Sequence, residues 1–224
     1  MSKALSFTRL DFVTIKPYLT VKNLLLLLAV CVFFGVGTGS APGMIGIVVM
    51  YSSIYASYPF AVGEKNSLDM LYATLPISRK RIVEGRYLFS LCMNVSAAVL
   101  SVLLSGALLT ALNKGWNLTE ALVTAGGSMG LFLLIESVQL PLYFKLGYAK
   151  AKFLVYLPLA AFPAVVIAGA SLFGKENSLA AVRSLTAWLD ANLYLALAFA
   201  ALVPCAAFIA SCLLSVSIYR KRDL

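Results

Sequence analysis

The feature that most constrains the fold of this chain is a set of apolar stretches, most of them near the roughly 20 residues that cross a hydrocarbon core of about 30 Å. There are six: residues 23–39, 41–62, 87–112, 122–144, 153–173 and 192–217. In lipid every backbone N–H and C=O needs a partner within the protein, so only helices and closed barrels span a membrane. Barrel strands alternate polar and apolar residues over about ten positions, and these stretches do not. The sequence therefore predicts an all-α membrane protein with six transmembrane helices.

The composition supports this class and excludes several kinds of site. Hydrophobic residues make up 61% of the 224-residue chain and charged residues 12%, with a mean hydropathy of +0.92. Soluble domains are about 45–50% apolar and about 25% charged. The chain has no His, which removes His-based zinc sites, His general bases and Ser-His-Asp triads. We treat residues 1–224 as one transmembrane domain, because no connection is long enough for a soluble domain.

The distribution of Lys and Arg predicts the orientation. Of the 18 basic residues, 15 lie before the first stretch, between the second and third, between the fourth and fifth, or after the last. Only Lys114, Lys175 and Arg183 lie in the connections on the other side. Basic residues accumulate in cytoplasmic loops, so we expect both termini in the cytoplasm. The net charge of +9 is then explained by topology and by attraction to anionic lipid, and no nucleic-acid partner is needed.

The longest polar connection is residues 63–86, GEKNSLDMLYATLPISRKRIVEGR. Ser67 can begin a short helix, Pro76 ends it, and Ser78 caps a second helix that continues into the third stretch. The first helix has one apolar stripe, formed by Leu68, Leu71, Tyr72 and Leu75. Such a helix suits docking into the groove of a soluble partner, and equally suits lying flat on lipid with its arginines reaching the headgroups. The residues alone leave both alternatives open.

Glu136 is the one acidic residue deep inside an apolar stretch, with Gln139 one turn later and Pro141 after it. A carboxylate at mid-membrane is costly, so it should face protein, water or a partner. One hypothesis makes Glu136 a cavity-lining or proton-linked residue. The other makes it a structural carboxylate, protonated or hydrogen-bonded. Pro141 removes a backbone hydrogen bond and predicts a kink or the end of the regular helix.

The chain has no nucleotide-binding motif of its own. Residues 169–176, GASLFGKE, approach the P-loop pattern GxxxxGK[ST]. Glu176 replaces the hydroxyl that would hold Mg²⁺, and the segment ends an apolar stretch instead of following a strand. We therefore expect no cofactor and no metal in this chain, and no enzymatic activity.

Two motifs resemble the permease subunits of bacterial ABC-2 type transporters, in particular the small six-span permeases that include phenol-soluble modulin exporters. The first, NSLDMLYATLPISRKRIVEGRYL, matches the family pattern at Leu75, Pro76, Ser78, Arg79, Ile82, Val83, Gly85, Arg86, Tyr87 and Leu88. The second, LPLYFKLGYAKAKF at 140–153, matches at Pro141, Leu142, Tyr143, Phe144, Lys145, Gly147 and Tyr148. With six spans, the resemblance covers essentially the whole chain.

The resemblance implies a dimer of permeases that binds two copies of a separate ATPase, which would carry ATP and Mg²⁺. It implies that residues 63–86 hold a coupling helix in the cleft of the ATPase. The residues expected near the ATPase are Asp69, Tyr72, Leu75, Pro76 and Arg79. It also implies that the N-terminal segment, residues 1–22, is interfacial and contains an elbow helix at 4–17.

The function predicted from these observations is ATP-driven export across a bacterial cytoplasmic membrane by a multi-pass permease. The expected cargo is an amphipathic peptide or a hydrophobic compound, because the mostly apolar spans offer no charge pair that would select a small ion. The alternative is a proton-coupled secondary carrier that uses Glu136 and needs no ATPase.

Overall fold

A computed structural model describes residues 3–66, 78–153, 184 and 191–221, and all of its regular elements there are helices. A short N-terminal helix and a single 3-10 turn precede five long helices. In chain order the elements are α1 (Lys3–Ile15), η1 (Lys16–Tyr18), α2 (Val21–Thr38), α3 (Ala41–Lys65), α5 (Arg79–Ala111), α6 (Leu118–Leu146) and α9 (Leu193–Arg220). The all-helical prediction is confirmed for these residues.

Within the described residues, five helices are long and apolar enough to cross a membrane: α2, α3, α5, α6 and α9. They coincide with five of the six predicted stretches. The fifth predicted stretch, 153–173, lies outside the described residues after Phe153. Helix α5 has 33 residues and at 1.5 Å per residue is about 50 Å long. It therefore extends well beyond a hydrocarbon core of about 30 Å. This length agrees with the prediction that a helix beginning after Ser78 continues into the third stretch.

Pro141 does not end α6, which continues to Leu146 with the proline inside it. The prediction that the helix might end there is therefore wrong. A proline at 141 leaves the carbonyl of Ser137 without its intrahelical N–H donor. The hydroxyl of Ser211 on α9 donates to that carbonyl at 2.6 Å. The neighbouring helix thus replaces the missing hydrogen bond, which is how interior prolines are tolerated in membrane helices.

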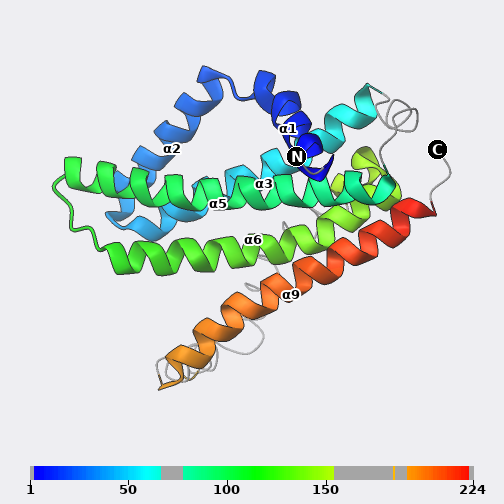
Figure 1. Cartoon of the computed structure of the whole chain (residues 1–224). Coiled ribbons are helices and arrows are strands. Elements are labelled where there is room, and N and C mark those ends of the chain that lie inside the picture. The colour runs from blue at the N-terminus through cyan, green and yellow to red at the C-terminus, as the bar shows by residue number, and fades with distance from the viewer. Residues whose placement is uncertain (1–2, 67–77, 154–183, 185–190, 222–224) are drawn as a thin grey trace, which may run out of the picture.

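The long helices form a bundle in which α3, α6 and α9 run in one direction and α5 runs in the opposite direction (Figure 1). Helices α5 and α6 run side by side, α3 packs against both, and α9 lies along α6 and diverges from it toward its first residues. Gly130 allows the approach of α9, because a Cβ there would lie 3.2 Å from the carbonyl oxygen of Ala200. Helix α1 packs against α5 and α3.

The interior contains two apolar clusters that follow one another along α5. One includes Ile82, Val83 and Tyr87 of that helix, and the other includes Ala97 and Leu109. Polar residues of α5 that are fully buried, Ser90 and Asn94, lie at the boundary between the clusters.

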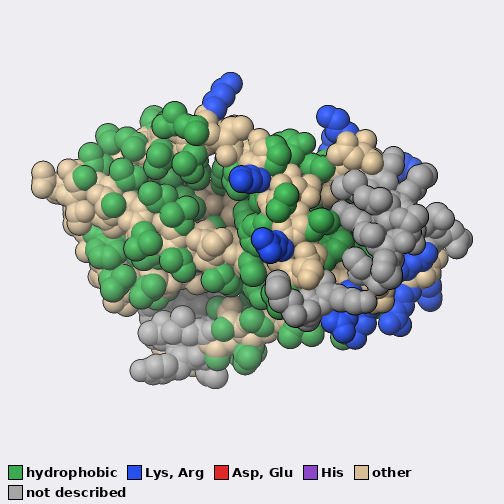
Figure 2. Space-filling view, turned by 45° about the horizontal axis from the view of Figure 1, so that its top comes forward, with side chains coloured by type: hydrophobic (Ala, Val, Ile, Leu, Met, Phe, Trp, Pro, Cys, Tyr) green, Lys and Arg blue, Asp and Glu red, His purple; other side chains and the backbone are tan. Residues whose placement is uncertain are grey.

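The two ends of the bundle differ in charge. We call the end at which α3, α6 and α9 finish and α5 begins the basic end. Its Lys and Arg residues are Lys65, Arg79, Lys80, Arg81, Arg86, Lys145, Lys150, Lys152, Arg220 and Lys221. At the opposite end, the described connections carry Lys114 alone. On the face shown in Figure 2, hydrophobic side chains cover the left-hand half, and most Lys and Arg side chains gather on the right.

Lys114 has a structural role at its end of the bundle. Its Nζ donates to the carbonyl oxygens of Gly35 at 3.1 Å and Val36 at 2.6 Å, in the last turn of α2. The carbonyl oxygen of Gly35 also accepts from the backbone N–H of Gly39 at 3.1 Å, and a cation at these C-terminal carbonyls complements the helix dipole. Gly39 follows in the left-handed region, with φ of 64°, and turns the chain into α3.

Candidate functional site

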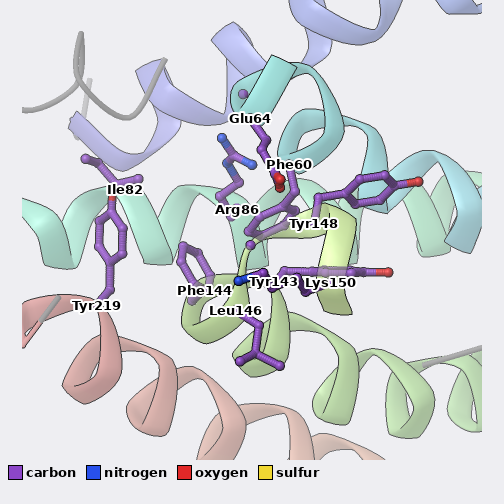
Figure 3. Close-up of a pocket in the computed structure, with 12 residues that line it drawn as sticks. Phe60, Glu64, Ile82, Arg86, Tyr143, Phe144, Leu146, Tyr148, Lys150 and Tyr219 are labelled. Carbon is purple, nitrogen blue, oxygen red and sulfur yellow. The ribbon is translucent and has the colours of Figure 1, made fainter. Parts of the chain in front are cut away.

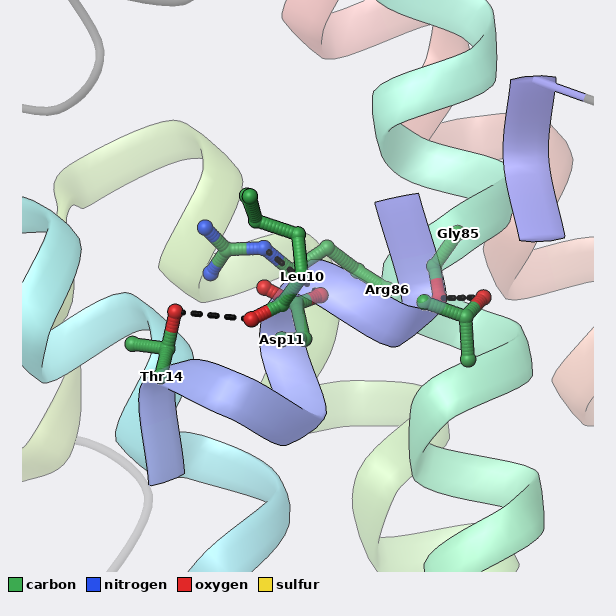
Figure 4. A network of polar contacts seen from close by, with 6 residues as sticks. Leu10, Asp11, Thr14, Gly85 and Arg86 are labelled. Atoms are coloured by element: carbon green, nitrogen blue, oxygen red, sulfur yellow. Dashed lines mark hydrogen bonds and ion pairs between the residues drawn. The ribbon is translucent and has the colours of Figure 1, made fainter. Parts of the chain in front are cut away.

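A buried ion pair at the basic end joins α1 to α5. Asp11 on α1 is 1% exposed and Arg86 on α5 is 4% exposed. The Nε of Arg86 lies 3.5 Å from Oδ2 of Asp11 (Figure 4). The guanidinium also lies over the ring of Phe60 on α3, 4.3 Å from its centroid. Arg86, a residue of the first motif, therefore contacts two other helices.

Helix α1 is fixed to α5 by two further contacts. The hydroxyl of Thr8 donates to the carbonyl oxygen of Gly85 at 3.1 Å, and the ring of Phe12 lies edge-on to Phe89 at 4.8 Å between centroids. Phe7 and Ile15, four residues on either side of Asp11, are also buried. Most of the segment predicted as an elbow helix, 4–17, is helical as α1, and the buried face of α1 includes a carboxylate. The location of this helix at the cytoplasmic interface stays a prediction.

Burial is the main influence on the carboxyl of Asp11, which precedes the first membrane-spanning helix. Loss of water raises its pKa to about 6, and the charge of Arg86 opposes that rise. Burial thus outweighs the attraction between the two charges. Asp11 and Arg86 also have side-chain nitrogen and oxygen atoms without hydrogen-bond partners, so the pair is less completely satisfied than a typical buried polar group.

Beside this pair lies a cavity of about 260 Å³ at the basic end (Figure 3). Four helices and the residues after α6 contribute to its wall. The lining residues are Phe60, Gly63, Glu64, Ile82, Arg86, Tyr143, Phe144, Leu146, Gly147, Tyr148, Lys150 and Tyr219. Arg86 and Ile82 come from the first motif, and six of the others come from the second. The fold therefore brings the two motifs together around one cavity.

The second motif turns the chain at Gly147, and this turn is bound to the end of α3. Gly147 has φ of 80°, a region that favours glycine. Glu64 accepts a hydrogen bond from the backbone N–H of Ala149 at 3.0 Å. A Cβ at 147 would lie 3.1 Å from Oε2 of Glu64. Residues 148–153 are helical, so the carboxylate lies at the start of a helical segment, where a negative charge is favoured.

Arg79 joins the start of α5 to the end of α9. Its Nη1 donates to the carbonyl oxygens of Tyr219 at 3.3 Å and Arg220 at 3.1 Å. These carbonyls belong to the last turn of α9, so Arg79 caps the C-terminal end of that helix as Lys114 caps that of α2. Ser78 occupies the N-cap position of α5 as predicted, although its side chain makes no capping hydrogen bond.

Among the residues predicted to lie near an ATPase, the structure therefore places Arg79. The other four, Asp69, Tyr72, Leu75 and Pro76, lie outside the described residues, as do Ser67 and the whole of the predicted stripe. Glu176, which breaks the P-loop pattern, lies outside them too.

Glu136 lies deep within α6, at the boundary between the two apolar clusters, and is 1% exposed. Its carboxylate accepts from the hydroxyl of Ser90, and from Nδ2 of Asn94 at 2.9 Å and 2.8 Å. Gln139, the other polar candidate on this helix, is 8% exposed. These two donors are neutral and come from α5, and Ser53 of α3 also hydrogen-bonds the carboxylate. Glu136 therefore joins α6 to α5 and α3 within the apolar interior.

Sequence reasoning did not identify Asp11 or Glu64. Asp11 obscured the apolar stripe of α1, because a charged residue interrupts the pattern between Phe7 and Ile15. Treating it as buried would have given one face with a spacing of four residues. Nothing in the sequence of α1 indicates that its partner lies 75 positions later in the chain, at Arg86. In the part of the chain that the structure describes, no group of three acidic, Cys or His side chains could hold a metal ion.

Comparison with known proteins agrees with the placement of the two motifs. Residues 8–220 match the family model for ABC-2 family transporter proteins. This match begins inside α1 and ends at the last residue of α9, so it includes the whole basic end. No curated protein matches the chain.

Proposed function

Since the chain belongs to the ABC-2 family of transporter proteins, we propose that it is the permease subunit of an ATP-binding cassette exporter. It acts as a dimer with a second copy and binds two copies of a separate ATPase, which carries ATP and Mg²⁺. It has six spans, and its basic end and both termini face the cytoplasm of a bacterial cell. Its cargo is an amphipathic peptide or a hydrophobic compound, the class that phenol-soluble modulin exporters handle.

The observation that carries this proposal is the convergence of both motifs and α1 at the basic end. A subunit driven by a soluble ATPase needs a surface at which movement of the ATPase is transmitted to several transmembrane helices at once. Arg79 connects α5 to the last turn of α9, and Arg86 connects α5 to α1 and α3. These are the contacts that a force applied to residues 63–86 would reach first.

The proposed mechanism follows from the length of α5. When the ATPases close on ATP, they displace the coupling helix and with it the first turns of α5. Because α5 is one continuous helix of 33 residues, displacement at Arg79 is carried along its whole length. Helices α1 and α9 move with it through Arg86 and Arg79. The spans then shift between inward-open and outward-open or closed arrangements.

The proposal is tested with a matched pair of variants, Arg79→Ala and Lys114→Ala. Each removes a cation that closes the last turn of a helix, Arg79 at the basic end and Lys114 at the opposite end. We expect Arg79→Ala to reduce transport and cargo-stimulated ATPase activity, and Lys114→Ala to leave the coupling between them intact. The measurements are co-purification of the ATPase with the tagged chain, followed by both activities in liposomes. The proposal is wrong if no ATPase co-purifies and substitutions of Leu75 and Arg79 leave transport unchanged.

The alternative, a proton-coupled carrier, rests on the burial of Glu136. Such a carrier would transport in liposomes that contain this chain alone, driven by a proton gradient, and Glu136→Gln would abolish that transport. We favour a structural role, because two neutral donors of α5 already occupy both oxygens of the carboxylate.

A further inference from the structure

A second cavity lies apart from the site at the basic end, between α5 and α9. It has a volume of about 440 Å³, within the range of small-molecule sites. Leu88 and Leu91 line it from α5, and Phe208, Ile209 and Leu213 line it from α9. We call it the α5–α9 groove. Two of its wall residues are largely exposed, Ile209 at 62% and Leu213 at 69%, so the groove opens on the surface of the bundle.

The floor of the groove offers no free polar group. Tyr87 lies there with its ring 5.0 Å from that of Phe208. Its hydroxyl shares hydrogen bonds of 2.7 Å with the hydroxyls of both Ser211 and Ser215. A ligand in the groove therefore contacts hydrocarbon and aromatic carbon along its length. Such a surface suits an aliphatic chain.

One end of the groove is charged. Arg81 and Glu84, in the first two turns of α5, line it at the basic end. Glu84 is shared between two cations, with Nζ of Lys80 at 3.5 Å and Nε of Arg81 at 3.8 Å. Two positive charges therefore face one negative charge, and both cationic side chains are about half exposed. The excess charge complements an anionic group.

The length of the groove matches one leaflet of a bilayer. Ten residues separate Arg81 from Leu91 on α5, which is about 15 Å at 1.5 Å per residue. Half of a hydrocarbon core of about 30 Å is the same depth. A molecule with its anionic group at Arg81 would thus place its chain along the groove to the middle of the membrane.

We propose that the α5–α9 groove binds an anionic phospholipid of the leaflet at the basic end. One acyl chain lies between the two helices, and the headgroup phosphate lies against Arg81 and Lys80. This inference does not depend on the direction of transport or on the nature of the cargo.

The test uses the purified full-length chain in detergent, titrated with phosphatidylglycerol or phosphatidylcholine and examined by native mass spectrometry. We expect phosphatidylglycerol to be retained at lipid concentrations that leave phosphatidylcholine unbound. Arg81→Gln should weaken phosphatidylglycerol binding about five-fold, the effect of one basic residue near an anionic lipid. Lys221→Gln removes a basic residue from the same end outside the groove and should have little effect.

A second pair of variants tests the apolar part of the groove. Leu213→Trp places a large ring in it and should displace most of the bound lipid. Leu202→Trp is the matched control, since Leu202 lies on the same helix, is 67% exposed against 69% for Leu213, and does not line the groove. All four substitutions are at exposed positions, and thermal unfolding of each variant confirms that it folds.

Three results would overturn the proposal. Equal retention of the two lipids would show that the headgroup is not recognised. Retention of phosphatidylglycerol by Leu213→Trp would place the lipid elsewhere. A change in oligomeric state on Leu213→Trp, with lipid binding intact, would make the groove an interface between copies of the chain.

Discussion

Two buried carboxylates, Asp11 and Glu136, are each 1% exposed, yet the protein accommodates them in opposite ways. Glu136 accepts hydrogen bonds from the neutral side chains of Ser90 and Asn94 on α5, and no ion pair among the described residues includes it. Asp11 faces the guanidinium of Arg86 at 3.5 Å, and both of its oxygens lack a hydrogen-bond donor by the usual geometry. One carboxylate is enclosed by hydrogen bonds, and the other faces a cation whose attraction is weaker than the cost of burial.

The difference indicates different roles. Hydrogen bonds to Glu136 have strict geometry, and they fix α5 against α6 where the two apolar clusters meet. An ion pair depends less on direction, so it tolerates small movements of α1 over α5. It also lies beside the cavity at the basic end, which Arg86 lines. We therefore expect Glu136 to act as a fixed point of the bundle and Asp11 to act as the adjustable attachment of α1.

The largest expected effect is that of breaking the ion pair from the α5 side. Arg86→Leu leaves the Asp11 carboxylate buried without its cation, which destabilises a protein by about 3–5 kcal/mol. We expect a lower midpoint of thermal unfolding and faster hydrogen exchange in α1. Adding Asp11→Asn should recover much of the loss, because the orphaned charge is then removed. Lys80→Leu is the control, since that ion pair is exposed and is worth about 1 kcal/mol at most. Equal effects of Arg86→Leu and Lys80→Leu would contradict the role given to the buried pair.

The next largest effect concerns Glu136, the fixed point of the bundle. Glu136→Leu leaves the donors of Ser90 and Asn94 without an acceptor, at about 1–3 kcal/mol for each buried group. Comparable hydrogen bonds inside membrane proteins average about 0.6 kcal/mol, so the total should be smaller than for Arg86→Leu. Glu136→Gln retains an acceptor and should lose less than Glu136→Leu. Unfolding in detergent ranks the stability losses of these variants, and a transport assay of Glu136→Gln tests whether the carboxyl is needed for transport. A Gln variant that is stable but transports nothing would favour the proton-coupled alternative.

The sequence was sufficient for the spans and insufficient for the contacts between them. Five helices agree with predicted stretches because the thickness of the bilayer sets the length of an apolar segment, which is a local property. Of the two outcomes predicted for Pro141, a kink or the end of the helix, the second was wrong. Ser211, 70 positions later, donates to the carbonyl that the proline leaves without a donor. Asp11 was missed for the same reason, since its partner is distant in sequence. Arg86 and Gly147 were identified through the motifs, but their meeting at one cavity depends on how the helices pack.

The smallest expected effect, and the sharpest test of the comparison, is the change with pH in how strongly α1 docks on the bundle. The pKa of Asp11 is about 6 in the folded protein against an ordinary value of 3.8, so the docked helix binds a proton that the undocked helix releases. Docking is therefore strongest below pH 4 and weakens as the pH rises through 6. Between pH 7 and pH 5.5 the free energy of docking of α1 should become more favourable by under about 1 kcal/mol. The absence of His leaves few other groups that titrate in this interval.

Hydrogen exchange in α1, corrected for the intrinsic effect of pH on exchange, measures this response. Protection of α1 should increase toward pH 5.5 in the natural chain. It should stay constant in Asp11→Asn, because the Asn side chain does not titrate. Helix α2 provides the internal reference, because it carries no acidic residue. Stronger protection of α1 at pH 7 than at pH 5.5 would mean that the attraction of Arg86 outweighs burial.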